Sequence, residues 1–130
     1  MAPSNVNISI DNAFAERFAA EWIAAWNGHD VDAVLVHYSD DFEMSSPYII
    51  RIAGEPSGTL RGKPAVADYW RKALALVPDL KFELLSTLVG VKSITLYYKG
   101  ARGSLVAEVF HFAADGKVAK AYAHYAVRVP

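Results

Sequence analysis

The residue in this sequence best placed to do chemistry is Glu108, a lone acid in an apolar stretch near the C-terminus. Apolar and polar residues alternate along Ser104–Tyr125 on both sides of Asp115-Gly116, which predicts two strands joined by a tight turn. Alternate residues of a strand lie on one face, so Glu108 shares its face with Val106 and Phe110. A carboxylic acid on an apolar face usually has either a hydrogen-bond partner or a functional role.

The strand pairing expected around Glu108 leaves little side-chain volume next to it. If Ala113 faces Gly116 across the turn, Glu108 pairs with Ala121. The same face then carries otherwise only apolar and aromatic residues: Val106, Phe110, Phe112, Ala119, Ala121, Ala123 and Tyr125. Protein interiors pack densely, so these alanines indicate either a closely packed helix or a cavity. An apolar cavity with one convergent acid is the usual form of a small-molecule site.

The composition of the chain limits the class of protein and the kinds of partner that can be expected. Its 130 residues suit a single domain over residues 11–130, preceded by a loose tail at residues 1–10. The absence of cysteine excludes disulfides and cysteine-based zinc sites, and scattered basic residues with a net charge of −1 argue against nucleic acid. No apolar run is long enough to span a membrane, and Met1–Ile10 lacks the features of a secretory signal. We therefore expect a cytoplasmic protein that binds neither nucleic acid nor membrane.

Helix-capping residues and prolines predict three helices before the main series of strands. The first begins at Asp11 or Asn12 and runs to about Trp26, with an aromatic residue at every fourth position. Asp30 caps a short second helix, and Pro64 occupies the first position of the third.

The strands follow almost without interruption. The alternating patterns predict strands at about Phe42–Tyr48 and then at residues 81–89, 93–99, 104–112 and 117–127. Residues 48–60 combine apolar residues with the turn sequence GEPSG, which predicts an extended flap that closes over the site as a lid. Helices first and antiparallel strands afterwards indicate an α+β fold, with three N-terminal helices packed on a curved, mainly antiparallel sheet.

The order of several short segments carries a family resemblance. After the first helix come WNGHDVDAV, YSDDFEM, LRGKPAVADYW, PDLKFEL and EVFHFAADGKVAKAY. In this order, over about residues 12–126, the chain resembles the SnoaL-like branch of the nuclear transport factor 2-like superfamily. The resemblance implies a cone-shaped α+β barrel in which a curved sheet and helices enclose one pocket, commonly in a dimer. The family includes polyketide cyclases, ketosteroid isomerases, limonene epoxide hydrolases, scytalone dehydratase and members with no known chemistry, so the fold leaves the function open.

Ketosteroid isomerase resembles this chain over its whole length, but only one of its three catalytic groups keeps its chemistry here. The position of its aspartate base is taken by Ser46, and a serine without an adjacent base cannot take a proton from carbon. Its oxyanion-hole tyrosine falls on Trp22, which can donate a hydrogen bond but not a proton. Its second oxyanion donor, a carboxylic acid held neutral by an apolar site, falls on Glu108. The resemblance therefore does not imply steroid isomerisation by that route.

We expect Glu108 to act as a general acid or base on a small, mostly apolar, oxygenated molecule. Cyclisation, isomerisation, dehydration and epoxide hydrolysis need only a placed acid or base and hydrogen bonds, so neither a cofactor nor a metal is expected. His37, Asp40, Asp41 and Glu43 lack a recognisable metal-ligand spacing and are assigned to helix ends and turns. The residues expected to contact the ligand come from all parts of the predicted barrel: Trp22, Trp26, Phe42, Met44, Ser46, Tyr69, Leu96, Tyr98, Phe110, Ala121, Ala123 and Tyr125.

The same residues also fit functions without catalysis. In these, Glu108 is a structural acid that accepts a hydrogen bond from Trp22 or from a tyrosine. The protein then either carries an apolar metabolite or has a vestigial pocket. In the second case its sheet surface serves dimerisation or the docking of a partner.

The sheet face opposite Glu108 predicts a homodimer. In the expected register this face carries Tyr97, Val109, His111, Tyr122 and His124, an aromatic surface that a monomer would rarely leave exposed. A one-residue bulge would instead turn Tyr122 and His124 toward the pocket.

Overall fold

One sheet of six strands organises the part of the chain that the structure, a computed structural model, describes: residues 10–127. The strand order is β2-β1-β6-β5-β4-β3, and the bounds are Tyr38–Ser45 (β1), Thr59–Arg61 (β2), Glu83–Gly90 (β3), Ser93–Lys99 (β4), Leu105–Phe112 (β5) and Val118–Tyr125 (β6). β1 runs parallel to β6, and every other neighbouring pair is antiparallel. The prediction of a mainly antiparallel sheet is confirmed.

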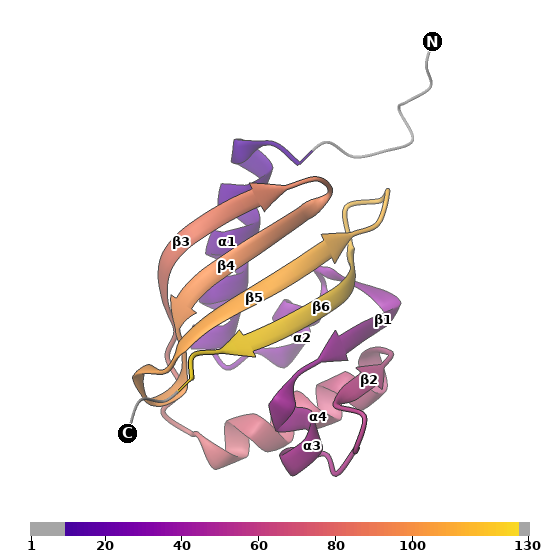
Figure 1. The fold of residues 1–130 in the computed structure, drawn as a ribbon, viewed down its shortest axis with the longest axis vertical. Helices are drawn as coiled ribbons and strands as arrows, with labels where there is room; N and C mark the ends of the chain where they lie inside the picture. The colour runs from indigo at the N-terminus through magenta and orange to yellow at the C-terminus, as the bar shows by residue number, and fades with distance from the viewer. Residues whose placement is uncertain (1–9, 128–130) are drawn as a thin grey trace.

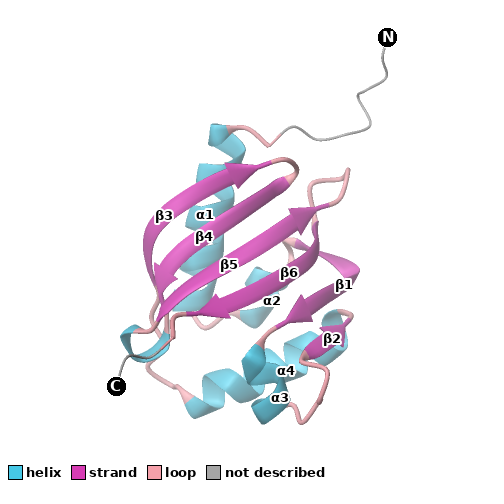
Figure 2. Ribbon diagram, in the orientation of Figure 1, coloured by secondary structure: helices cyan, strands magenta, loops and turns pink. Residues whose placement is uncertain are grey.

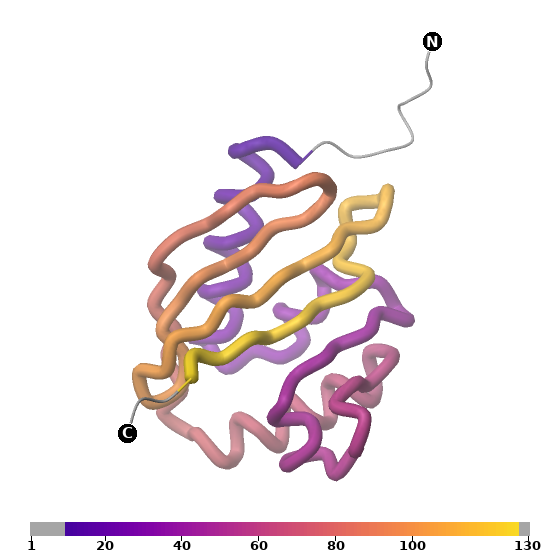
Figure 3. The backbone as a smooth tube through the Cα atoms, in the orientation of Figure 1, coloured from indigo at the N-terminus to yellow at the C-terminus, as the bar shows by residue number. Residues whose placement is uncertain are grey.

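Within the described residues, four α-helices accompany this sheet (Figures 1 and 2): α1 (Asn12–Asn27), α2 (Val31–Leu35), α3 (Pro47–Ile52) and α4 (Lys63–Leu76). α1 crosses behind β3, β4 and β5, whereas α3 and α4 lie at the end of the sheet formed by β1 and β2 (Figure 1). The tube trace in Figure 3 shows the long strands curving across α1. A short 3-10 turn, Ala101–Gly103, joins β4 to β5. The α+β fold class predicted from the sequence is confirmed, with one helix more than expected.

The two ends of the chain, residues 1–9 and 128–130, fall outside the described part. The tail expected at residues 1–10 therefore lies outside the described residues, apart from Ile10, which packs against the core. Within residues 10–127, no helix has the length and apolar character needed to cross a membrane.

The first two helices begin at the capping residues that the sequence indicates. The Asp11 carboxylate accepts a hydrogen bond from the backbone N–H of Phe14 at 2.8 Å, and Asp30 does the same for Ala33 at 3.0 Å. The buried face of α1 follows helical spacing and comprises Ala15, Phe18, Ala19, Trp22 and Trp26. α1 thus presents a row of large rings to the sheet.

The prediction of an extended flap at residues 48–60 is wrong. The hydroxyl of Ser46 accepts a hydrogen bond from the backbone N–H of Tyr48 at 3.2 Å, and Pro47 takes the first helical position, so the segment turns into α3. Strand β1 accordingly ends at Ser45 rather than at Tyr48, and it begins at Tyr38 rather than at Phe42. Ile49 is fully buried in the core, which argues against a lid formed by this segment.

The register expected for the last hairpin is also wrong, by two separate single-residue shifts. The backbone N–H of Ala113 donates to the carbonyl of Lys117, so the turn is one residue longer than expected and Phe112 pairs with Val118. A bulge next to this pair then adds a second residue, Ala119, on the β6 side. Val118 is consequently buried in the core in place of Ala119.

The two shifts add up to two residues, so the residues of β6 predicted to share a face with Glu108 still do so. Glu108 pairs with Ala123 instead of Ala121, and Phe110 pairs with Ala121. Because side chains alternate with a period of two, both alanines still point to the buried side. Tyr122 and His124 remain on the opposite face, as predicted.

A single side chain fastens the C-terminal end of α1 to the start of β3. The Asn27 amide donates to the carbonyl of Phe82 at 3.0 Å, and its oxygen accepts from the Phe82 backbone N–H at 2.7 Å. Both backbone groups belong to the irregular segment before β3, where no strand partner satisfies them. Asn27 therefore replaces a missing pair of ladder hydrogen bonds.

We predict that Asn27→Ala lowers the free energy of unfolding by about 1–3 kcal/mol, because it leaves two part-buried backbone groups unpaired. The matched control is Asn12→Ala at the exposed start of the same helix, where a change of less than about 0.5 kcal/mol is expected. Urea denaturation of both variants measures the difference. Equal losses in the two variants would show that the Asn27 contacts contribute nothing specific.

Candidate functional site

Glu108 lies in the middle of β5 with its carboxyl group inside the barrel. The residue is 4% exposed, and Oε1 accepts a hydrogen bond from the hydroxyl of Tyr98 at 2.8 Å. Across the β4–β5 ladder Leu96 faces Glu108 and Tyr98 faces Val106, so Tyr98 approaches the acid diagonally. An aromatic side chain is long enough to span that diagonal separation.

The environment of Glu108 favours its neutral form. Burial raises the pKa of this carboxyl from 4.5 to about 7, and the hydrogen bond from Tyr98 acts in the opposite direction with a smaller effect. None of the ion pairs within residues 10–127 involves Glu108. A carboxyl group with a pKa near neutrality can both release and accept a proton at physiological pH.

Four tyrosines surround this acid closely enough to respond to its charge: Tyr38, Tyr69, Tyr98 and Tyr125. Burial is the main cause of the raised pKa of each phenol, and the negative charge of Glu108 raises it further. The pKa of Tyr69 reaches about 12. All four phenols are therefore protonated at neutral pH, and the hydroxyl of Tyr98 already donates to Glu108.

Ser46 joins two of these tyrosines at the end of β1. The residue is 4% exposed, and its hydroxyl lies near enough to the phenols of Tyr69 and Tyr125 to lower their pKa through hydrogen bonding. The ring of Tyr48 packs edge-on against that of Tyr125, with centroids 4.7 Å apart. The parallel pairing of β1 with β6 produces this arrangement, because it aligns the end of β1 with the end of β6.

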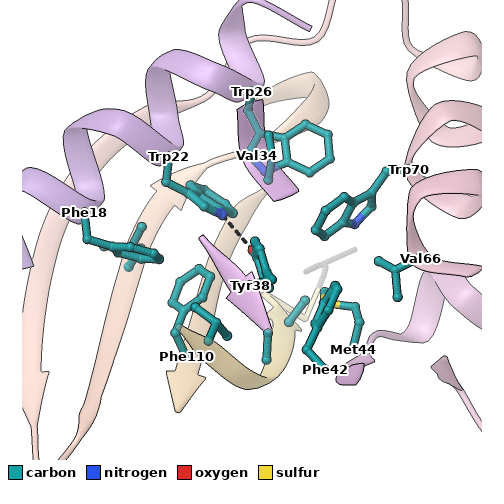
Figure 4. Packing of buried hydrophobic residues seen from close by; sticks show 14 of the residues in the cluster. Phe18, Trp22, Trp26, Val34, Tyr38, Phe42, Met44, Val66, Trp70 and Phe110 are labelled. Carbon is teal, nitrogen blue, oxygen red and sulfur yellow. Dashed lines mark hydrogen bonds between the residues drawn. The ribbon is translucent and has the colours of Figure 1, made fainter. Parts of the chain in front are cut away.

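Trp22 does not contact Glu108 through a hydrogen bond. Its indole N–H donates instead to the hydroxyl of Tyr38 at 2.9 Å, as Figure 4 shows. The structural hydrogen bond considered for Glu108 therefore comes from a tyrosine and not from Trp22. The indole nitrogen of Trp26 is buried without a hydrogen-bond partner in the described part of the chain.

The structure gathers the residues expected to contact a ligand in its interior. Ser46 is buried, Tyr125 is half-buried, and the other members of the set belong to the buried core: Trp22, Trp26, Phe42, Met44, Tyr69, Leu96, Tyr98, Phe110, Ala121 and Ala123. Contact of these residues with a ligand stays a prediction. Asp40 and Glu43 lie apart from them in ion pairs with Lys63 and Arg61, and Nε2 of His37 lies 3.8 Å from a carboxylate oxygen of Glu21.

Three aromatic residues next to this set are not among the ligand contacts expected from the sequence. Tyr38 accepts the hydrogen bond of Trp22, Trp70 packs against Trp26 with ring centroids 5.1 Å apart, and Phe82 packs against Tyr98 at 4.7 Å. Tyr38 was assigned to the buried side of the short second helix, because the first strand was predicted to begin later, whereas it is the first residue of β1. Trp70 was the alternative to Tyr69 on the buried face of the third predicted helix, and the structure buries both.

Two hollows on the described surface lie away from Glu108. One of about 80 Å³ lies between α1 and the β5–β6 turn and includes Phe18 and His37. The other, of about 680 Å³, is a groove between α2 and α4 that includes Asp32 and Arg71. The cavity expected next to Glu108 stays a prediction.

Comparisons with known proteins agree with this geometry. A family model described as the SnoaL-like domain matches residues 19–121. A SnoaL-like protein of unknown function from Burkholderia thailandensis E264 is 59% identical, with a TM-score of 0.88 over 92% of this chain and 100% of the other. No curated protein matches the chain significantly.

More distant structures share the fold. A candidate polyketide cyclase from Sinorhizobium meliloti is 18% identical, with a TM-score of 0.67 over 83% of this chain and 94% of the other. A candidate ketosteroid isomerase from Kribbella flavida is 12% identical, with a TM-score of 0.66 over 91% of this chain and 82% of the other. At such identities the likeness concerns the fold alone.

The raised pKa of Glu108 predicts that the protein loses stability as the pH rises from about 4.5 to about 7. In this window the folded state holds a proton that the unfolded state releases, so the free energy of unfolding falls and then levels off. The difference between the two pKa values corresponds to at most roughly 3 kcal/mol. Urea unfolding at about pH 5 and about pH 8 measures the change.

The control is Glu108→Gln, which keeps the shape of the side chain but cannot titrate. Between about pH 5 and about pH 8 the variant should lose less stability than the wild type, by up to the difference given above. At about pH 8 the variant should be at least as stable as the wild type. Identical pH dependence in the two proteins would mean that Glu108 has an ordinary pKa.

Proposed function

Because the chain belongs to the SnoaL-like domain family, we propose that it is an enzyme in which Glu108 acts as general acid or base on a small, mostly apolar, oxygenated molecule. The observation that carries the proposal is the buried acid itself, which lacks an ion-pair partner among residues 10–127 and has a pKa of about 7. The candidate cyclase and the candidate isomerase that share the fold support the same general class.

The contacts of Glu108 suit proton transfer. Tyr98 holds Oε1, which leaves Oε2 for a reacting oxygen or carbon of the substrate. The protonated acid would donate to a carbonyl or leaving oxygen, and the carboxylate would take a proton in the reverse role. The phenols of Tyr38, Tyr69 and Tyr125 would donate hydrogen bonds to oxygen atoms of the substrate. This chemistry draws only on side chains, which is why the proposed enzyme works without a cofactor.

A non-catalytic binding protein is the second candidate. The observation that favours it is the hydrogen bond between Tyr98 and Glu108, since a buried structural acid would make the same contact. In that case the interior holds an apolar metabolite without changing it. The two candidates differ in whether the proton of Glu108 is needed for turnover.

We predict that Glu108→Gln lowers turnover by at least roughly 10²–10⁴-fold, the usual contribution of a general acid or base, while ligand binding survives. Suitable test substrates are an unsaturated ketone, an epoxide and an enolisable ester. In Tyr98→Phe, loss of the hydrogen bond that stabilises the carboxylate should raise the pKa of Glu108 and move the midpoint of the pH–rate profile upward.

The matched control is Tyr97→Phe, on the outward face of the same strand, which should leave the pH–rate profile unchanged. Full turnover by Glu108→Gln would exclude Glu108 from the mechanism. Binding of a test molecule without turnover by the wild type would favour the carrier.

A homodimer through the outer sheet face stays a prediction, as does the cytoplasmic location. The face presents Tyr97, which is 37% exposed, and Leu88, which is 52% exposed, next to the residues selected from the sequence. We expect sedimentation at micromolar concentration to show a dimer, and Tyr97→Glu to weaken it by placing a charge in an apolar interface. A monomeric wild type would contradict this assembly.

A further inference from the structure

The smaller of the two hollows described above lies between α1 and the turn that joins β5 to β6. Its volume of about 80 Å³ is well below the range of about 300–1,000 Å³ found for pockets that hold drug-sized ligands, so only a small ligand fits. Six of its lining side chains are charged, titratable or aromatic: Phe14, Arg17, Phe18, Glu21, His37 and Lys117. This group lies apart from Glu108 and has no part in the proposed function.

The cations of this hollow outnumber its acid. Neither Arg17 nor Lys117 forms an ion pair with a carboxylate among residues 10–127. The ammonium of Lys117 donates to the carbonyl of Val36 at 2.8 Å, which fixes its position and leaves two of its three protons for a ligand. Two cations less the carboxylate of Glu21 give the hollow a net charge of +1 when His37 is neutral and +2 when it is protonated. The charge therefore favours an anion.

His37 is the group of the hollow whose charge changes near neutral pH. Its side chain is 15% exposed, and its ring packs edge-on against that of Phe18 with centroids 5.3 Å apart. The charged groups that face it are Arg17 and Glu21 from α1 and Lys117 from the turn. Burial lowers the pKa of His37, Glu21 raises it, and Lys117 lowers it again. An anion bound beside the ring would stabilise the protonated form, as any opposite charge nearby does.

Two acids near the hollow leave room for such an anion. Glu21 is exposed, and its carboxylate oxygen lies 3.8 Å from Nε2 of His37, beyond hydrogen-bond distance. It can therefore turn toward solvent when an anion takes its place. The carboxylate of Asp115 accepts the backbone N–H of Lys117 at 3.0 Å and does not line the hollow. An entering anion thus displaces one exposed carboxylate.

Two phenyl rings form the apolar side of the hollow. Both pack edge-on against Phe112, Phe14 with centroids 5.4 Å apart and Phe18 with centroids 5.2 Å apart, so both are held in place. Contact with these rings stabilises a hydrocarbon group, because it removes apolar surface from water. An inorganic oxyanion would use only the cations, whereas an organic carboxylate uses the cations and the rings.

We propose that this hollow binds a short-chain organic carboxylate, represented by propionate. The carboxylate lies between the cations of Arg17 and Lys117 and accepts a hydrogen bond from Nε2 of His37. The hydrocarbon chain lies against the rings of Phe14 and Phe18. Binding is tighter when His37 is protonated and weakens as the pH rises through its pKa.

The first test is NMR titration of the full-length protein with sodium propionate at about pH 7.5, where His37 is mostly neutral because its pKa is lowered from 6.5. Ionic strength is held constant with chloride, and the backbone N–H of Gly116, which lines the hollow, reports binding. Lys117→Gln should weaken binding at least about threefold, because it removes a charged hydrogen bond. Glu21→Gln should tighten it at least about twofold, because it removes the competing carboxylate. Both positions are exposed, so both variants should fold.

The second test lowers the pH to about 5.5. The wild type should then bind propionate about threefold more tightly than at about pH 7.5, because His37 gains a charge beside the anion. His37→Gln cannot titrate and should show no such gain. An equal gain in this variant would overturn the role of His37 and with it the proposed placement of the carboxylate.

The matched control is Lys81→Gln, which removes the same charge from an exposed lysine outside the hollow. It should bind propionate as the wild type does. Propionamide, which lacks the charge, and formate, which lacks the chain, should both bind more weakly than propionate. Tighter binding of phosphate than of propionate would overturn the assignment to organic carboxylates. Absence of saturable binding, or an equal loss in Lys81→Gln and Lys117→Gln, would overturn the site.

Discussion

The interior of this protein depends on the burial of one carboxyl group without an ion-pair partner among residues 10–127. A buried carboxylate is unfavourable unless it is paired, and the structure meets this cost by keeping the proton on Glu108 up to about neutral pH and supplying one phenol as donor. The donor is available only because the β4–β5 register places Tyr98 diagonally across from the acid. The pairing of β4 with β5 therefore sets the proton affinity of Glu108 and, with it, the chemistry open to the site.

Polar contacts also fix the rotation of α1, which carries the opposite wall. Trp22 is tied to β1 through Tyr38, and Asn27 is tied to the start of β3 through Phe82. The rings of α1 meet strand rings edge-on and the ring of Phe82 stacked, at centroid separations of about 5–6 Å, the range that aromatic pairs prefer. The helix cannot turn about its axis without losing directional hydrogen bonds at both positions. The aromatic interior is consequently a defined arrangement of planes rather than a loose apolar filling.

The sequence was sufficient for the fold class and for the position of Glu108, because alternation and capping are local properties. It was not sufficient where two local signals compete. Tyr48-Ile49-Ile50 has strand composition, but the Ser46 cap and the proline after it start a helix, and the cap decided the outcome. Phe82 was missed for another reason: a strand was predicted from residue 81, whereas β3 begins at Glu83 and Phe82 lies in the irregular segment before it, where strand alternation does not apply. The choice between Trp22 and a tyrosine as the partner of Glu108 likewise required the spatial register.

The bulge beside the last turn has an evolutionary consequence. The longer turn and the extra residue at Ala119 each displace β6 by one position relative to β5, and only together do they keep Ala121 and Ala123 against the acid. A single insertion or deletion in this hairpin would exchange these alanines for Tyr122 and His124 and force two bulky rings into the barrel. Length changes in this hairpin should therefore be inherited in compensating pairs. Homologues that differ here by one residue at the turn should also have lost or moved the bulge.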